Sequence, residues 1–228
     1  MLRGNKLVVF FVGVLVVGML GLTAQSTSGQ DQVLRSALDA ADITDIHPHF
    51  AHTTQDRAIV HLIFNGLVRY KTGDITQFEP DLAKSWDVSE DGIVWTFHLR
   101  QGVMCHPWNG NPGYELTSED VVYSLQGSAD PARSAFAGEY AGMTFEAVDR
   151  YTVKITLETS LSPLLFLPKV ADYAGGLIIS KKAAEDLGEG FRTHPVGTGP
   201  FVFQSYTPME KVVVVRNEDY FRGAPKLA

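Results

Sequence analysis

Residues 93–100 alternate apolar and polar side chains, and no other pattern in the sequence limits the possible folds as strongly. In an extended chain, Trp95, Phe97 and Leu99 lie on one side and the polar residues between them lie on the other. Asp91-Gly92 precedes this run and follows another short apolar one, and Asp-Gly is typical of the tight turn in a β-hairpin. The sequence therefore predicts an antiparallel hairpin that buries one face.

Three segments carry the signals of helices. One begins at Thr54 with Thr53 or Thr54 as its cap, and we expect Asn65-Gly66 to end it, because glycine is favoured just after a helix. A second opens at 117–120, where Thr-Ser-Glu-Asp supplies a cap and an acidic first turn, and we expect Gly127 to close it. A third, short and capped, spans 180–187.

Strand patterns occur at 33–41, 152–158, 200–206 and 211–216, and a turn at Pro208 joins the last two. Strands and helices are mixed without the regular strand–helix–strand order that builds a parallel sheet. We therefore predict an α+β or mixed α/β fold.

Residues 1–24 have the order of a secretory signal peptide. Arg3 and Lys6 precede sixteen uncharged residues, from Leu7 to Leu22, and a small residue follows. The apolar run is shorter than the ~20 residues that span a bilayer, and an uncleaved anchor is the alternative. Residues 25–32 are small and polar, as in a linker. We expect an exported, periplasmic or otherwise extracytoplasmic protein, tethered to the membrane if the peptide is not cleaved.

The charge of the chain excludes two classes of partner. The net charge is −7, and it becomes −9 once Arg3 and Lys6 leave with the signal peptide. Nucleic acid and anionic lipid both demand a basic surface, so neither is expected as a ligand. The single cysteine, Cys105, has no partner for an internal disulfide, and its apolar setting predicts a buried small side chain rather than a reactive thiol.

Several motifs, in order along the chain, resemble those of the family 5 extracellular solute-binding proteins. These are the oligopeptide-, dipeptide- and nickel-binding components of ABC importers. The motifs lie at 80–86, 89–92, 95–103, His106, 116–125, 195–201 and 216–221. Any one of them is weak evidence, but the ordered set covers nearly all of the chain beyond the linker.

The resemblance implies the first lobe of a two-lobed, type II-like periplasmic-binding-protein clamp. Residues 33–74 and 175–228 would form its anchoring domain, and 75–174 an inserted small domain. The second lobe is absent from this chain, and the ending at 225–228 suggests a break within a longer protein. The implied function is capture of a peptide or other small polar solute by a monomer, without a cofactor or catalytic residues, and delivery to ABC permease subunits.

Two departures from the family pattern concern the ligand. Cys105 stands where the family usually has an aromatic residue, and 107–114 is an apparent insertion beside it. Trp108 and Tyr114 in this insertion would reach the cleft or the transporter, or else cover the edge of the small domain. The second departure is Ile46-His47-Pro48, which replaces the common Leu-Asp-Pro.

The resemblance places the ligand against two loops, because sites in hinged clamps lie between the lobes. The expected ligand-binding residues are Asp45, Ile46, His47, Tyr173, Ala174, Gly175 and Gly176. Glycine allows a backbone to approach a ligand closely. Tyr173 would stack on the solute or pack beneath the hinge, and the sequence does not decide between these.

Two other functions are weighed against solute capture. His47, His49, His52 and His61 form a local cluster that would suit a carrier of nickel, another metal chelate or haem. A secreted hydrolase is less favoured, because the sequence lacks the Gly-x-Ser-x-Gly elbow and a paired nucleophile and base. The glycines at 197 and 199 lack the lysine of a phosphate-binding loop.

Overall fold

The structure is a computed structural model, and it describes residues 43, 45–173, 175–208 and 210–227. The predicted signal peptide, the linker and the strand at 33–41 lie outside these residues. All described residues belong to one compact unit. Within the described ranges, no helix is both long and apolar enough to cross a membrane.

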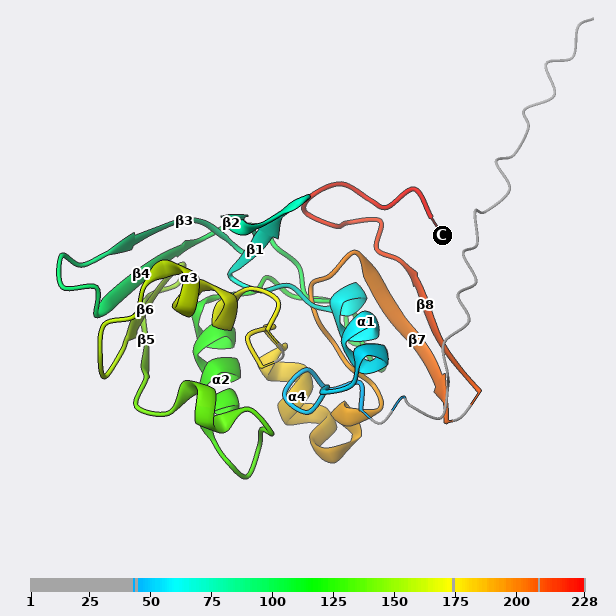
Figure 1. The fold of residues 1–228 in the computed structure, drawn as a ribbon. Coiled ribbons are helices and arrows are strands. Elements are labelled where there is room, and N and C mark those ends of the chain that lie inside the picture. Colours follow the sequence, from blue (N-terminus) through cyan, green and yellow to red (C-terminus); the bar gives the residue numbers. More distant parts are fainter. Residues whose placement is uncertain (1–42, 44, 174, 209, 228) are drawn as a thin grey trace, which may run out of the picture. The chain divides into compact units, whose positions relative to one another are not determined.

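The described elements are short and mixed in order (Figure 1). The helices are α1 (Thr54–Ile63), α2 (Ser118–Ala129), α3 (Pro163–Phe166) and α4 (Lys181–Leu187), with 3-10 turns η2 (Ala137–Tyr140), η3 (Leu167–Val170) and η4 (Gly188–Arg192). The strands are β1 (Val68–Lys71), β2 (Asp74–Pro80), β3 (Ala83–Val88), β4 (Val94–Leu99), β5 (Thr144–Asp149), β6 (Thr152–Thr156), β7 (Phe201–Thr207) and β8 (Lys211–Arg216). The predicted mixture of helices and strands is confirmed.

An antiparallel sheet of strand order β3-β4-β6-β5 contains the predicted hairpin. The turn between β3 and β4 includes Gly92 at φ +71, a conformation that glycine adopts without strain. Trp95, Phe97 and Leu99 are each at most 1% exposed, so the predicted buried face is confirmed. Helix α2 packs against β5 and β6, and it covers the sheet as Figure 1 shows.

The β1–β2 hairpin and strand β5 carry no clear signal in the sequence. Strand β1 has only four residues, and β5 exposes every residue except the half-buried Phe145. Neither strand has the alternating burial on which a period of two depends. The predicted strands at 152–158, 200–206 and 211–216 correspond to β6, β7 and β8, and the β7–β8 hairpin packs against α1.

The predicted helix starts are confirmed, but two predicted ends are wrong. Helix α1 stops at Ile63, before Gly66, and a Cβ on Gly66 would lie 2.0 Å from the carbonyl oxygen of Ala171. Gly66 therefore permits a close approach of two backbones and does not end the helix. Helix α2 continues past Gly127 to Ala129, and Gly127 leaves room there for the side chains of His49 and Arg133.

Two clusters of buried side chains form the interior. The first core lies between the four-stranded sheet, α2 and the segment 163–171, and the second lies among α1, α4 and the β7–β8 hairpin. Residues 177–179 run between them: Ile178 belongs to the first core, and Leu177 and Ile179 to the second. Successive side chains of an extended segment point to opposite sides, so one segment serves both cores. The domain boundaries at 74 and 175 stay a prediction.

Cys105 is 2% exposed in the first core, and burial raises the pKa of its thiol. The prediction of a buried small side chain is confirmed. Trp108 in the neighbouring insertion packs against the second core, and its indole Nε1 donates to Asp186 at 2.9 Å. Tyr114 packs against the first core. Both aromatic residues therefore cover core edges in this part of the protein.

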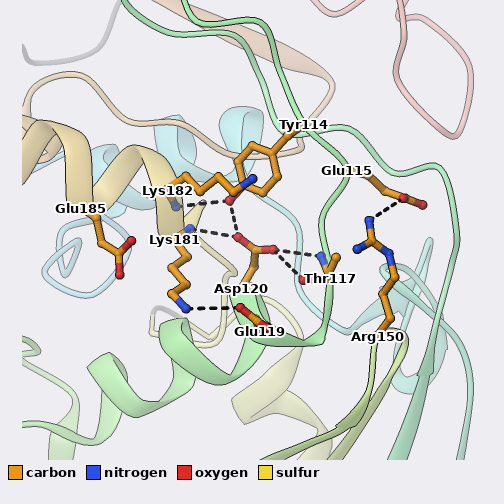
Figure 2. A pocket seen from close by; sticks show the side chains of 9 residues that line it. All are labelled: Tyr114, Glu115, Thr117, Glu119, Asp120, Arg150, Lys181, Lys182 and Glu185. Atoms are coloured by element: carbon orange, nitrogen blue, oxygen red, sulfur yellow. Dashed lines mark hydrogen bonds and ion pairs between the residues drawn. The ribbon is translucent and has the colours of Figure 1, made fainter.

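The insertion helps to fasten α2 to α4 through the carboxylate of Asp120 (Figure 2). Asp120 accepts hydrogen bonds from the Tyr114 hydroxyl, the Thr117 amide at 2.9 Å and the Lys181 amide at 3.1 Å. A hollow beside this junction is lined by charged side chains that include two ion pairs, Lys181 with Glu119 at 3.3 Å and Arg150 with Glu115 at 3.1 Å. A carboxylate that satisfies two helix starts is a structural junction.

Candidate functional site

The two loops predicted to bind the ligand lie side by side. The Gly175 amide donates to the carbonyl oxygen of Pro48 at 3.0 Å, so residues 45–50 and 172–176 contact each other directly. On the α2 side, the Ser128 hydroxyl donates to the carbonyl oxygen of Gly175. We call these two segments the paired loops. Ala174 lies outside the described residues.

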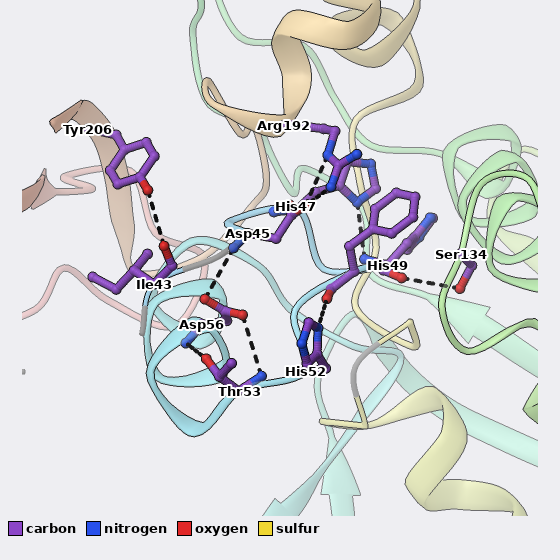
Figure 3. Close-up of polar contacts among 11 residues, drawn as sticks. Ile43, Asp45, His47, His49, His52, Thr53, Asp56, Ser134, Arg192 and Tyr206 are labelled. Carbon is purple, nitrogen blue, oxygen red and sulfur yellow. Dashed lines mark hydrogen bonds and ion pairs between the residues drawn. The ribbon is translucent and has the colours of Figure 1, made fainter. Parts of the chain in front are cut away.

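Asp45 holds the first of the paired loops in place (Figure 3). Its carboxylate forms an ion pair with Arg192, whose Nε donates at 3.0 Å, and it also accepts the His47 amide at 2.9 Å. The side chain of Asp45 is 6% exposed, and Ile46 is fully buried in the second core. Both residues therefore support the loop from inside the protein.

His47 and His49 are neutral imidazoles inside this loop. Burial, together with the charges of Arg192 and Arg133, lowers the pKa of His47 to about 3. Burial also lowers the pKa of His49 well below its usual value. The His49 amide donates to Nδ1 of His47 at 3.0 Å, and the His49 carbonyl accepts the Ala135 amide at 2.9 Å. The loop is thus fixed from within and from the segment that follows α2.

The glycines of the second loop satisfy packing inside the protein. A Cβ on Gly176 would lie 2.1 Å from the carbonyl oxygen of Lys169. Gly175 has φ +93, and a Cβ there would lie 3.1 Å from the ring of Tyr140. Both glycines therefore permit close packing within the protein, and their role in ligand binding stays a prediction. Tyr173 is half-buried with its ring edge-on to Phe136 at 5.7 Å, so it packs and is also partly accessible.

A hollow of about 400 Å³, which we call the arginine hollow, borders the first of the paired loops. Its polar and aromatic lining includes His47, His49, Phe50, Tyr123, Arg133, Glu189 and Arg192. The sequence predicted only the histidines as functional candidates. The two arginines are 59 positions apart on unrelated elements, and no local pattern signals that the fold brings them together.

The local histidine cluster divides in the structure, because the rings of His47 and His49 lie 4.8 Å apart while His52 and His61 have other surroundings. His52 is exposed and its Nδ1 donates to the Phe50 carbonyl at 2.8 Å, whereas His61 is half-buried on α1. Among the residues that the structure describes, no group of three or more His, Cys, Asp or Glu side chains could hold a metal ion. The paired loops and the arginine hollow remain as the candidate site.

Relatives of known identity match this chain along most of its described length. Di/tripeptide-binding protein 2 of Pseudomonas aeruginosa (strain UCBPP-PA14) is 34% identical over 75% of this chain and 35% of its own. Heme-binding protein A of Haemophilus influenzae is also 34% identical, over 72% of this chain and 33% of its own. The chain thus spans about a third of the length of these curated relatives.

Solved structures of periplasmic binding proteins have the same fold. MoaA of A. tumefaciens R10, in complex with mannopinic acid, is 42% identical with a TM-score of 0.79, and the match covers 87% of this chain and 40% of MoaA. DppA of Helicobacter pylori, in complex with the peptide STSA, is 32% identical with a TM-score of 0.71, over 79% of this chain and 38% of DppA. These matches confirm the predicted lobe of a two-lobed clamp.

Residues 77–228 match the family model "Bacterial extracellular solute-binding proteins, family 5 Middle". The matched segment includes the four-stranded sheet, both cores in part and the second of the paired loops. The chain belongs to the family 5 extracellular solute-binding proteins.

Proposed function

We propose that the full-length protein captures a peptide or similar small solute outside the cytoplasmic membrane and delivers it to an ABC permease. This chain supplies the first lobe of the clamp. The observation that carries the proposal is the direct contact of the paired loops beside the arginine hollow. Ligand sites are concave and lie preferentially between domains, and two loops locked together form one wall of such a site.

The wall is rigid before the ligand arrives. The Asp45–Arg192 ion pair and the Gly175–Pro48 hydrogen bond hold the paired loops, so a solute need not order them on binding. Preorganisation of this kind lowers the entropic cost of association. His47 and Tyr173 are partly exposed and would contact the solute directly. Asp45, Ile46, Gly175 and Gly176 are buried and would shape the wall behind them, and Ala174 would complete the second loop. Closure of the second lobe would complete the site, as in other hinged domains.

The family and the named relatives are binding proteins, and we propose that this protein performs no catalysis. Binding without turnover predicts that a solute leaves the protein chemically unchanged. We also propose export through the N-terminal segment 1–24, in agreement with the extracellular family to which the chain belongs.

A second candidate is carriage of haem or a nickel chelate. Heme-binding protein A is among the relatives, and NikZ of Campylobacter jejuni, in complex with Ni(L-His), is 27% identical with a TM-score of 0.64. The observation in favour is His47, whose neutral imidazole borders the arginine hollow. Neutral imidazole is the form that ligates metals.

The test is identification of the natural solute. Full-length protein is purified without denaturation, and mass spectrometry identifies the small molecules that co-purify. Calorimetry then measures binding of Met-Leu, mannopinic acid, Ni(L-His) and haem. Stoichiometric binding of an organic solute that is recovered intact supports the main proposal, and selective binding of haem or the nickel complex favours the second. Failure to bind any solute, or chemical conversion of the solute, contradicts both.

A further inference from the structure

Arg133 carries a positive charge that no acidic side chain neutralises among the residues described by the structure. The other arginine of the hollow, Arg192, is paired with Asp45. Arg133 forms no such ion pair, and its guanidinium lies over the ring of Tyr123 at 4.7 Å from the ring centroid. Glu189 also lines the hollow, but it is exposed and pairs with neither arginine in the described contacts.

The surroundings of Arg133 favour an anion over a neutral solute. The Tyr123 ring covers one side of the Arg133 guanidinium, and the imidazole of His47, which also lines the hollow, adds no competing positive charge. A guanidinium offers several N–H donors in a fixed planar arrangement that matches the two oxygens of a carboxylate. Charge-assisted hydrogen bonds are strongest where solvent is partly excluded.

The segment that carries Arg133 is held in place. Asp130 caps the end of α2, and its carbonyl accepts the Arg133 amide at 2.9 Å. Two residues further along, the Ala135 amide donates to the carbonyl of His49 at 2.9 Å, and the Ser134 hydroxyl donates to the same oxygen at 3.3 Å. The backbone below Arg133 is thus tied to the first of the paired loops.

We propose that Arg133 binds a carboxylate of the transported solute, and that the solute class is therefore small organic acids, including peptides with a free C-terminus. This inference rests on the proposed function. It assigns a specificity-determining residue within the arginine hollow, where an acid would place its carboxylate between Arg133 and the paired loops.

The experiment is calorimetry on the full-length protein with Met-Leu, Met-Leu amide and mannopinic acid. Arg133→Gln is expected to weaken whichever acid the wild type binds by about tenfold or more, the loss expected for a charge-assisted hydrogen bond. Arg133→Lys keeps the positive charge but lacks the planar set of N–H donors, and it is expected to bind the acid more tightly than Arg133→Gln and less tightly than wild type. Lys84→Gln, an equal change of charge at an exposed position on β3, is expected to stay within about twofold of wild type.

Met-Leu amide, which lacks the carboxylate, and a substitution of Glu189 provide further tests. Met-Leu amide is expected to bind wild type and Arg133→Gln alike. Glu189→Gln removes an acid from the rim and is expected to strengthen acid binding, so weaker binding contradicts the proposal. Circular dichroism and the melting temperature verify that each variant is folded.

Two outcomes separate this inference from the proposed function. Arg133→Gln that binds an acid within about twofold of wild type overturns the role of Arg133 and leaves solute capture standing. Wild-type protein that binds a neutral solute, but neither Met-Leu nor mannopinic acid, also overturns the role of Arg133 and leaves solute capture standing. A protein that binds nothing, including in the co-purification experiment, overturns both.

Discussion

Gly176→Ala is expected to destabilise the protein because two backbones meet at this position. The new Cβ would lie 2.1 Å from the carbonyl oxygen of Lys169, and contacts below 3.0 Å are essentially never seen, so the two segments must separate by about 1 Å. The same oxygen accepts the hydroxyl of Tyr140 at 2.7 Å, and Tyr140 is 1% exposed. Overpacking costs about 1–3 kcal/mol, and a weakened buried hydrogen bond adds about 1 kcal/mol. We expect a loss of about 3 kcal/mol.

The assay is urea unfolding of the full-length protein, followed by far-UV circular dichroism. Gly138→Ala is the matched control, because a Cβ there has no atom within 4 Å and its backbone is not in the left-handed region. Solute affinity is measured in parallel, since the strain falls on the second of the paired loops. If Gly176→Ala is as stable as the control, the close approach of 176 and 169 is not a feature of the native protein.

Asp45→Asn is expected to lower the free energy of unfolding by about 1–3 kcal/mol in the same urea assay, because it removes the buried partner of Arg192. Cys105 is expected to react with a thiol reagent only after unfolding, since burial raises the pKa of its thiol. His47 has a pKa of about 3 in the folded state against the ordinary 6.5, so the unfolded state takes up the proton first as the pH falls. We therefore expect stability to decrease below about pH 6.5, by up to about 1.4 kcal/mol per pH unit from this group, and His47→Gln to flatten that part of the profile.

Each of these expectations has an outcome that contradicts it. Asp45→Asn that unfolds at the same urea concentration as Glu210→Gln, a change at an exposed ion pair, would mean that the charge does not hold the loop. Rapid labelling of Cys105 in the native protein would contradict its burial. Equal stability at neutral pH and about pH 5, in wild type and His47→Gln alike, would rule out a buried neutral imidazole.

Local signals in the sequence were sufficient for the features that local physics controls. The buried face of Trp95, Phe97 and Leu99 follows from alternation, and the starts of α1 and α2 follow from capping residues within four positions. The errors at Gly66 and Gly127 have a different origin. Both glycines permit close tertiary contacts. In the sequence alone, such a glycine cannot be distinguished from one that ends a helix.

The candidate site likewise combines features that were predicted from the sequence with features that only the tertiary fold reveals. The resemblance to a family predicted the positions of the paired loops, but no pattern within the sequence could show that Gly175 donates to Pro48, 127 positions away. The pairing of Arg192 with Asp45 joins residues 147 positions apart. Arg133 carries no signal of its own, because its significance lies in a charge that no acidic side chain pairs with in the described part of the folded chain.

A crystal structure of the full-length protein with its co-purified solute tests the central claim most directly. The account predicts that the solute lies between the lobes against residues 45–50 and 172–176, with a carboxylate within hydrogen-bonding distance of Arg133. A solute enclosed elsewhere, for example against the outer face of the four-stranded sheet, would contradict the assignment of these loops as the wall of the binding site.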